Sequence, residues 1–147
     1  MRKLKPGDIF EFAVPEGFGY ALYTHHHALM GSLIRVAQAR FKVRPTHLDK
    51  IFSSIDSSPV FFAVQTAVKR KYLVYIGNYP IPESLKPFPI FRIGIQDYES
   101  GLVQPLTAWD GERELEDGLI KNIESLPQSR IISFPLLVDE VSTTALR

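Results

Sequence analysis

Acidic side chains gather beside aromatic residues in the second half of the chain. Between positions 98 and 117, six carboxylates accompany one tyrosine and one tryptophan: Tyr98, Glu99, Trp109, Asp110, Glu112, Glu114, Glu116 and Asp117. Paired carboxylates can perform acid–base catalysis when a dry pocket separates their pKa values. Consecutive carboxylates at a turn and a helix start are usually solvated, and a first helical turn favours negative charge. The tract therefore indicates a solvated face, or a docking surface for a basic partner, rather than an active site.

Three consecutive histidines, His25, His26 and His27, form the second group that could do chemistry. Neighbouring residues on a strand point to opposite faces, so only His25 and His27 could approach one ion. A metal site needs three or four ligands, and no HxxxH or HExxH spacing supplies the others. Only His47 remains outside the triplet. We therefore expect no metal site and predict that the triplet lies in a solvated loop or contacts a partner.

Motifs for nucleophilic catalysis and phosphate binding do not occur in the sequence. It has no GxSxG, GxGxxG, P-loop or SxxK pattern. It also has no cysteine, which excludes a disulfide framework, a thiolate metal site and a cysteine nucleophile. Gly17-Phe18-Gly19 falls within a predicted hairpin rather than between a strand and a helix. We expect no catalytic residues and no cofactor, and hence a protein that is not an enzyme.

Charge is distributed unevenly, although the formal net charge is only +1. Residues 1–75 contain 11 Lys and Arg against 5 Asp and Glu, a net of +6, and residues 76–147 contain 6 against 11, a net of −5. A nucleic-acid-binding domain is usually basic as a whole. The basic half still leaves a second hypothesis open, a small barrel-type nucleic-acid-binding module. Its contacts would come from Arg35, Arg40, Lys42, Arg44, Lys69, Arg70 and Lys71.

The length and the hydrophobic pattern suit a single domain over residues 1–147. A chain of 147 residues with 45% hydrophobic residues can bury a core of its own. The longest apolar stretches, such as 60–64, have the length of a strand and fall far short of the ~18 residues of a spanning helix. No apolar signal region follows the basic N-terminus. We expect a cytoplasmic protein without membrane contact.

Turn residues and alternating hydrophobicity divide the chain into short elements. They predict a hairpin over 7–23, in which Gly19 marks a bend or a close backbone approach. They also predict strands at 33–43, 60–65, 72–76, 90–95, 102–109 and 130–138, and helices at 47–54 with Thr46 as N-cap, 66–71 and 115–126. Four prolines exclude an internal helix or a central strand at 80–89. The pattern predicts a β-rich α+β fold, built on a strongly bent antiparallel sheet or partial barrel with two or three short helices.

Several motifs occur in an order that resembles one known family. They are Lys5-Pro6-Gly7-Asp8-Ile9-Phe10, Pro15 to Gly19-Tyr20, Gly31-Ser32-Leu33-Ile34-Arg35-Val36, Phe62 to Ala67-Val68, Ile76-Gly77-Asn78-Tyr79-Pro80-Ile81-Pro82, Pro87-Phe88-Pro89-Ile90-Phe91-Arg92 and Trp109-Asp110-Gly111-Glu112. Together they resemble the immunity protein 26 family of bacterial polymorphic toxin systems, over about residues 5–115. The histidine triplet and the residues after Asp117 have no counterpart in this resemblance.

The resemblance implies a small cytoplasmic protein without catalysis that binds and neutralises a cognate protein toxin. Such an inhibitor needs a rigid surface of about 800 Å² and electrostatic complementarity to its partner. Many toxins are nucleases with a basic cleft, and an acidic patch could occupy the phosphate site of such a cleft. We therefore nominate the eight acidic and aromatic residues named first as the partner-binding surface, with Trp109 as its anchor.

Overall fold

The computed structural model describes residues 3–93, 107–115 and 125–147. The chain forms two compact units. The main unit comprises Met1–Pro87 and Ile131–Arg147, and the small unit comprises Phe88–Arg130.

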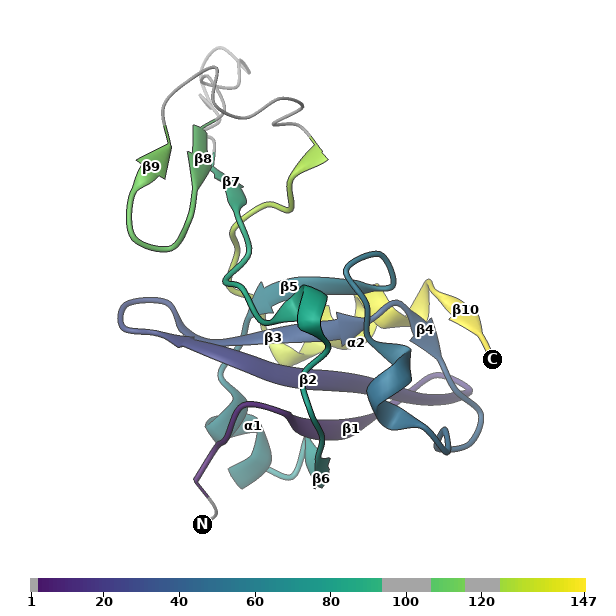
Figure 1. Cartoon of the computed structure of the whole chain (residues 1–147). Helices are drawn as coiled ribbons and strands as arrows, with labels where there is room; N and C mark the ends of the chain where they lie inside the picture. The colour runs from purple at the N-terminus through teal and green to yellow at the C-terminus, as the bar shows by residue number, and fades with distance from the viewer. Residues whose placement is uncertain (1–2, 94–106, 116–124) are drawn as a thin grey trace, which may run out of the picture. The chain divides into compact units, whose positions relative to one another are not determined.

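A five-stranded antiparallel sheet forms the main unit, in the order β5-β3-β2-β1-β6 (Figure 1). Its strands are β1 (Asp8–Val14), β2 (Gly17–His27), β3 (Gly31–Ala37), β5 (Ser57–Phe61) and β6 (Val74–Asn78). Irregular pairing between Ile9 and Phe10 on β1, and between Tyr23 and His25 on β2, interrupts the regular register. Such bulges bend a strand and increase its twist. A second ladder pairs β4 (Ala39–Arg40) in parallel with β10 (Ala145–Leu146).

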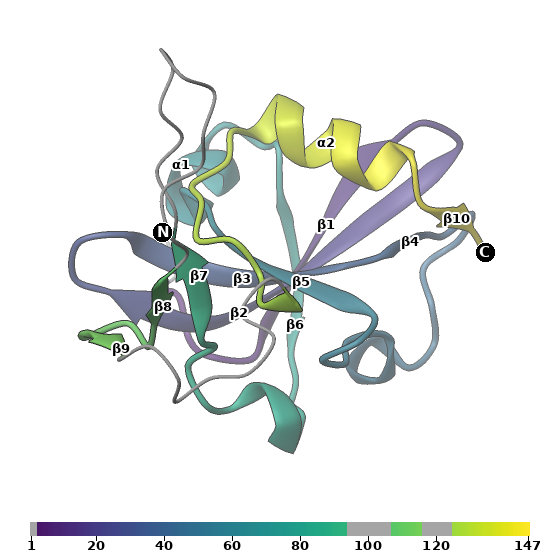
Figure 2. The same ribbon diagram turned by 90° about the horizontal axis from the view of Figure 1, so that it is seen from above.

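Hydrophobic clusters cover both faces of the main sheet, because side chains alternate between the faces along each strand. The helical segments are α1 (Val64–Lys69), α2 (Phe134–Ser142) and the 3-10 helices η1 (Leu48–Ile51) and η2 (Glu83–Leu85). The two α-helices lie on one face, where Leu137 of α2 shares a cluster with Phe10 and Phe12 (Figures 1 and 2). The two 3-10 helices lie on the other face, where Leu48 and Leu85 share a cluster with Tyr20, among others.

The predicted hairpin over 7–23 is confirmed. The pairing of β1 with β2 ends where Val14 stands opposite Gly17, so the turn consists of Pro15 and Glu16. The close backbone approach expected at Gly19 is instead the close approach of a side chain, since the Phe12 ring fills the space that a side chain at position 19 would need.

Two predictions for residues 33–54, those of a strand and of a helix, are wrong. The strand expected over 33–43 divides, because β3 ends at Ala37 and only Ala39–Arg40 continues as β4. The helix expected over 47–54 is the four-residue 3-10 helix η1, and Thr46 does not cap it. Its N-cap is His47, which makes no side-chain capping bond, so the capping-box spacing from Thr46 is out of phase.

The strand predicted over 130–138 is wrong as well, because most of that range belongs to helix α2. The Ser133 hydroxyl accepts a hydrogen bond from the backbone N–H three residues later and so caps the helix. Pro135 stands in the first turn, where a missing N–H costs nothing. Leu137 and Val141 lie four residues apart and are both buried. The short apolar run before position 139 could not distinguish a buried strand from this helix.

The small unit contains a three-stranded antiparallel sheet. Its strands are β7 (Phe91–Ile93), β8 (Thr107–Trp109) and β9 (Glu114–Leu115), in the order β7-β8-β9. The strands expected at 90–95 and 102–109 are confirmed in their described parts, and the remaining residues of both lie outside the described range. The helix expected over 115–126 also lies largely outside it, although Leu115 belongs to a strand.

The expected β-rich α+β fold with a large antiparallel sheet is confirmed, with two α-helices among the described residues. The described sheets are not closed into a barrel, because β5 and β6 end the order of the main sheet on opposite sides. None of the helices in the described part of the chain is long and apolar enough to cross a membrane.

Candidate functional site: the acidic hairpin

Four of the eight nominated residues lie together on the hairpin that joins β8 to β9. We refer to residues 109–114 as the acidic hairpin; the four nominated residues in it are Trp109, Asp110, Glu112 and Glu114. The other four, Tyr98, Glu99, Glu116 and Asp117, lie outside the described residues.

Asp110 shapes the turn of this hairpin. Its Oδ1 accepts hydrogen bonds from the backbone N–H groups of Glu112 (2.9 Å) and Arg113 (3.0 Å). These bonds, with that from Arg113 the stronger influence, hold the pKa of Asp110 below its usual value. Gly111 has a φ of +98°, a left-handed conformation that few other residues adopt. The Asp110 carboxylate is therefore ionised and engaged with its own turn.

Glu112 and Glu114 are the exposed carboxylates of the acidic hairpin. Glu114 is the cross-strand partner of Trp109, which is half-buried. The indole lies 6.0 Å from the ring centroids of both Phe88 and Phe91. Trp109 thus belongs to the hydrophobic support of the hairpin and keeps a partly exposed surface. The hairpin therefore presents negative charge at fixed positions next to a cluster of aromatic rings.

The histidine triplet lies in strand β2, so its expected place in a loop is wrong. Pairing with β3 continues to His27, which stands opposite Gly31. The His25 Nε2 lies 2.7 Å from the carbonyl oxygen of Lys86, an acceptor, so this nitrogen carries a proton. The His27 Nδ1 accepts two backbone N–H groups of the following turn, both at 3.1 Å. These rings secure the ends of loops. Among the described residues, no group of three His, Cys, Asp or Glu side chains is placed to hold a metal ion.

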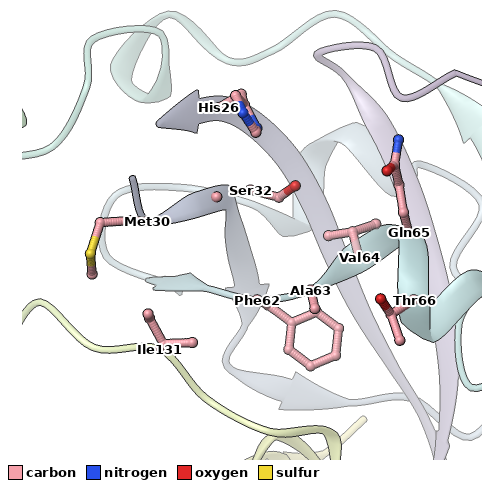
Figure 3. A pocket seen from close by; sticks show the side chains of 10 residues that line it. His26, Met30, Ser32, Phe62, Ala63, Val64, Gln65, Thr66 and Ile131 are labelled. Atoms are coloured by element: carbon pink, nitrogen blue, oxygen red, sulfur yellow. The ribbon is translucent and has the colours of Figure 1, made fainter. Parts of the chain in front are cut away.

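A pocket of about 250 Å³ lies beside the end of the β2–β3 hairpin and the start of α1 (Figure 3). Its lining combines apolar side chains such as Met30, Phe62 and Ile131 with the polar groups of His26 and Thr66. Small-molecule sites usually measure about 300–1,000 Å³. His26 is the one titratable side chain in the lining, so the pocket provides no acid–base pair.

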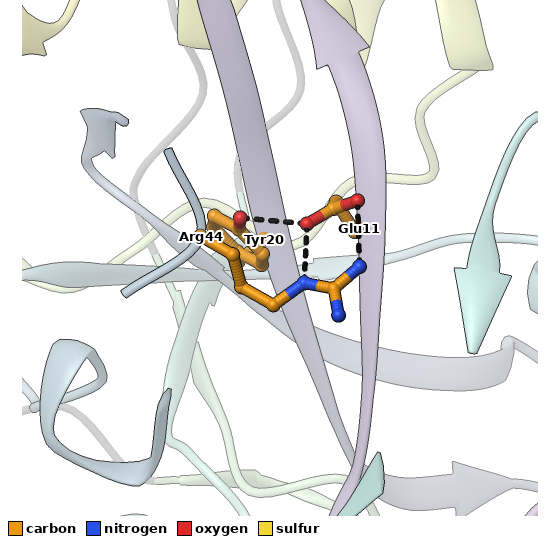
Figure 4. A network of polar contacts seen from close by, with 3 residues as sticks. All are labelled: Glu11, Tyr20 and Arg44. Atoms are coloured by element: carbon orange, nitrogen blue, oxygen red, sulfur yellow. Dashed lines mark hydrogen bonds and ion pairs between the residues drawn. The ribbon is translucent and has the colours of Figure 1, made fainter. Parts of the chain in front are cut away.

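A polar network on the main sheet also carries shifted pKa values (Figure 4). The Tyr20 hydroxyl donates to Glu11 Oε2 (2.7 Å), and the Arg44 guanidinium donates to both oxygens of Glu11 (2.9 and 3.2 Å). The hydrogen bond from Arg44 lowers the pKa of Glu11, and burial raises the pKa of Tyr20. Glu11 and Tyr20 are cross-strand partners, whereas Arg44 follows β4. The network connects the segment that contains Arg44 to the main sheet. The shifted pKa values of Glu11 and Tyr20 therefore accompany a structural role.

The basic residues of the nucleic-acid hypothesis are not all available at the surface. Arg35 in β3 is only 8% exposed, and burial lowers the pKa of its guanidinium. Arg40 donates to the carbonyl groups of Thr144 (3.0 Å) and Pro15 (3.2 Å). Arg40, Lys42 and Arg44 do not lie along one strand, because β4 ends at Arg40. The exposed members near α1 are Lys69, Arg70 and Lys71.

Comparison with protein-family models, with curated proteins and with solved structures finds no match to this chain. The resemblance to the immunity protein 26 family stays a prediction from the motifs.

Proposed function

We propose that this protein is a non-catalytic, cytoplasmic immunity protein that binds a cognate toxin through the acidic hairpin. One observation carries the proposal: Glu112 and Glu114 present exposed carboxylates on a turn that Asp110 shapes and that Phe88 and Trp109 support. The ordered motifs that resemble the immunity protein 26 family are the reason for proposing an immunity protein.

A preformed charged turn suits a protein inhibitor. Ordering a surface during association costs free energy, and a surface that is already ordered avoids this cost. Exposed carboxylates also attract a basic partner from a distance and accelerate its capture. A nuclease toxin with a basic phosphate-binding cleft is the partner that best fits this charge. Tyr98, Glu99, Glu116 and Asp117 extend the proposed surface on the basis of the sequence.

Most of the motifs that resemble the family serve the fold. Gly7 has a φ of +99°, and a β-carbon there would collide with the Tyr79 carbonyl oxygen. Asp8 is fully buried and accepts from the backbone N–H of Lys5 and from the Asn78 side chain, both at 2.9 Å. The exception is Trp109-Asp110-Gly111-Glu112, which forms most of the acidic hairpin. This motif is therefore the one from which we expect toxin binding.

The experiment is co-expression with the toxin encoded by the neighbouring gene. We expect the unaltered protein to restore growth, and the double charge reversal Glu112→Lys/Glu114→Lys to fail. Reversal of these two attractive charges should slow association with the toxin about tenfold and flatten the dependence of its rate on salt. The matched control is Asp56→Lys/Asp139→Lys, which reverses two exposed carboxylates of the main unit and changes the net charge by the same amount.

Three outcomes contradict the proposal in different ways. Unchanged rescue and unchanged association kinetics in the double variant reject the acidic hairpin as the docking site. Failure of the unaltered protein to bind or neutralise the toxin rejects the function. Turnover of a substrate by the purified protein, abolished by one substitution, rejects the non-catalytic role.

A further inference from the structure

Strand β6 leaves one side of its backbone open. It ends the order of the main sheet and pairs only with β1 among the described strands. In an antiparallel strand, alternate residues direct their N–H and C=O groups to opposite sides, so about half of these groups in β6 face away from β1. An unpaired edge of this kind is a template for another strand.

Hydrophobic side chains on and beside β6 are exposed. Val74 is 53% exposed and Tyr75 is 38% exposed, and Tyr72, just before the strand, is 45% exposed. Natural sheets usually protect an edge by covering it or by placing charge on the strand itself. β6 consists of Val-Tyr-Ile-Gly-Asn and carries no charge. The edge therefore combines open backbone groups with apolar contact area.

Three consecutive cations precede this edge. Lys69, Arg70 and Lys71 are exposed at the end of α1, and their side chains form no hydrogen bond or ion pair with any other described residue. The connection from α1 to β6 is tight, because the backbone N–H groups of Tyr72 and Leu73 both donate to the Ala67 carbonyl (2.8 and 3.3 Å). The positive charge therefore lies at the start of β6 and not at a distance along a loop.

Aromatic contacts fix the position of the segment from Tyr72 to Tyr75, which leads into and forms part of β6. The Tyr72 ring stacks on Phe134 of α2, with centroids 4.8 Å apart and an interplanar angle of 8°. The Tyr75 ring packs edge-on against the buried Phe10 (6.0 Å). Both contacts connect the segment from Tyr72 to Tyr75 with the main core. A partner strand would thus meet a preformed surface and not a fluctuating one.

We propose that the β6 edge is a docking site for an extended acidic segment of a partner protein, which adds a sixth strand to the main sheet. The strand provides backbone hydrogen bonds and the exposed apolar side chains provide contact area. In an antiparallel arrangement, residues that follow the bound strand reach Lys69, Arg70 and Lys71, so carboxylates are expected there. This inference does not depend on the acidic hairpin, which has the opposite charge.

A second copy of the chain fits the edge less well than an acidic segment does. If two β6 strands paired in an antiparallel manner, Asn78, Tyr79 and Pro80 of one copy would approach the basic residues of the other. None of these three residues carries a carboxylate. The cations would remain without partners, so charge complementarity favours an acidic partner.

The test uses a fluorescein-labelled peptide, Thr-Val-Thr-Val-Thr-Glu-Asp-Glu, with the full-length protein. We expect saturable binding by fluorescence anisotropy and slower hydrogen exchange at the amides of residues 74–78. Two control peptides separate the contributions of charge and strand pairing. Replacement of the acidic end by Lys-Arg-Lys should weaken binding about tenfold, because attraction becomes repulsion. Replacement of both valines by proline should abolish binding, because proline cannot extend a sheet.

A charge-reversal variant tests the site on the protein. Lys69→Glu/Arg70→Glu should weaken binding of the acidic peptide about three- to tenfold with an unchanged circular dichroism spectrum. Its matched control, Lys42→Glu/Lys50→Glu, reverses two exposed cations elsewhere in the main unit and should bind as the unaltered protein does. No binding of the acidic peptide, equal binding of the Lys-Arg-Lys peptide, or exchange protection outside residues 74–78 would overturn the proposal. Concentration-dependent self-association that protects β6 would overturn it in favour of a second copy.

Discussion

Phe12 and Gly19 stand opposite each other across the β1–β2 hairpin, and the Phe12 ring occupies the space of a side chain at position 19. Phe12 is buried in the cluster beneath α2, where its ring packs edge-on against Phe134 at 6.2 Å. The ring therefore cannot turn aside without disturbing the contact with α2. A glycine at position 19 lets β2 run directly alongside a core aromatic side chain.

Gly19→Ala should lower the free energy of unfolding by about 1–3 kcal/mol, because the added methyl group overpacks a filled site. Urea denaturation followed by circular dichroism measures the change. In a Phe12→Leu background the same substitution should cost less, since the smaller side chain leaves room. Equal costs in the two backgrounds would show that the Phe12 ring is not the obstacle.

Protonation of the Glu11 carboxylate should make the protein less stable at acidic pH. The hydrogen bond from Arg44 holds the pKa of Glu11 below its usual 4.5, and burial opposes this shift only in part. Because the pKa is lower in the folded state, the carboxylate stabilises the fold above pH 4.5 and loses this effect as the pH falls through the folded-state value. Glu11→Gln should lower stability at neutral pH and flatten the fall below pH 4.5 in urea titrations.

Glu83→Gln provides the comparison for Glu11. Glu83 is an exposed carboxylate that pairs with Lys86 on the surface, and such pairs contribute little. Its substitution should leave stability and its pH dependence nearly unchanged. If stability fell equally steeply below pH 4.5 in Glu11→Gln and in the unaltered protein, the role of Glu11 would be contradicted.

Tyr20 should contribute a decline in stability at alkaline pH. Burial raises the pKa of Tyr20 above its usual value of 10, and the hydrogen bond to the Glu11 carboxylate raises it further. The contribution is complete below pH 10 and decreases above it, because the unfolded chain releases the phenolic proton first. Tyr20→Phe should therefore be less sensitive to alkali. It should also be destabilised by roughly 1.5–3 kcal/mol at neutral pH, since it loses a hydrogen bond to a charged group.

Denaturation at a series of pH values measures the Tyr20 effect, and the difference in tyrosinate absorbance between the unaltered protein and Tyr20→Phe reports the ionisation of Tyr20. Tyr72→Phe removes a hydroxyl from a half-exposed ring and should have little influence on the alkaline decline. Burial also raises the pKa of Tyr23, so part of the decline should persist in Tyr20→Phe. Identical alkaline curves for Tyr20→Phe and the unaltered protein would contradict the prediction.

Lys71→Gly should stabilise the protein by roughly 0.5–1 kcal/mol. Lys71 follows α1 with a φ of +64°, a left-handed conformation that costs a residue with a side chain more than it costs glycine. Thermal unfolding by calorimetry measures the gain as a higher Tm. The neighbouring Arg70 has a φ of −83°, so Arg70→Gly should lower the Tm. A lower Tm in Lys71→Gly would show that its side chain contributes more than its backbone conformation costs.

Local signals in the sequence predict those parts of the fold whose partners are close along the chain. Pro15 and Glu16 lie between two alternating segments, and this pattern predicts the β1–β2 hairpin. The glycine at position 19 predicts a bend or a close backbone approach in the same hairpin, whereas the group that lies against it is the Phe12 side chain. Proximity also explains why the sequence identifies the acidic tract, because Asp110, Glu112 and Glu114 lie within five residues. The sequence did not predict that these residues form a hairpin, since a helix was expected from position 115, where the structure has strand β9.

Tertiary structure decided the features whose partners are distant. Arg44 reaches Glu11 across 33 positions, and Phe88 braces Trp109 across 21 positions, so neither contact follows from local spacing. The position of β6 at an open edge depends on strand order, which pairs it with β1 and places no described strand beyond it. Residue types along this chain therefore determined where charge and apolar character occur. Long-range pairing decided which of these groups became neighbours and which stayed exposed, because backbone hydrogen bonds and burial join segments regardless of their separation in sequence.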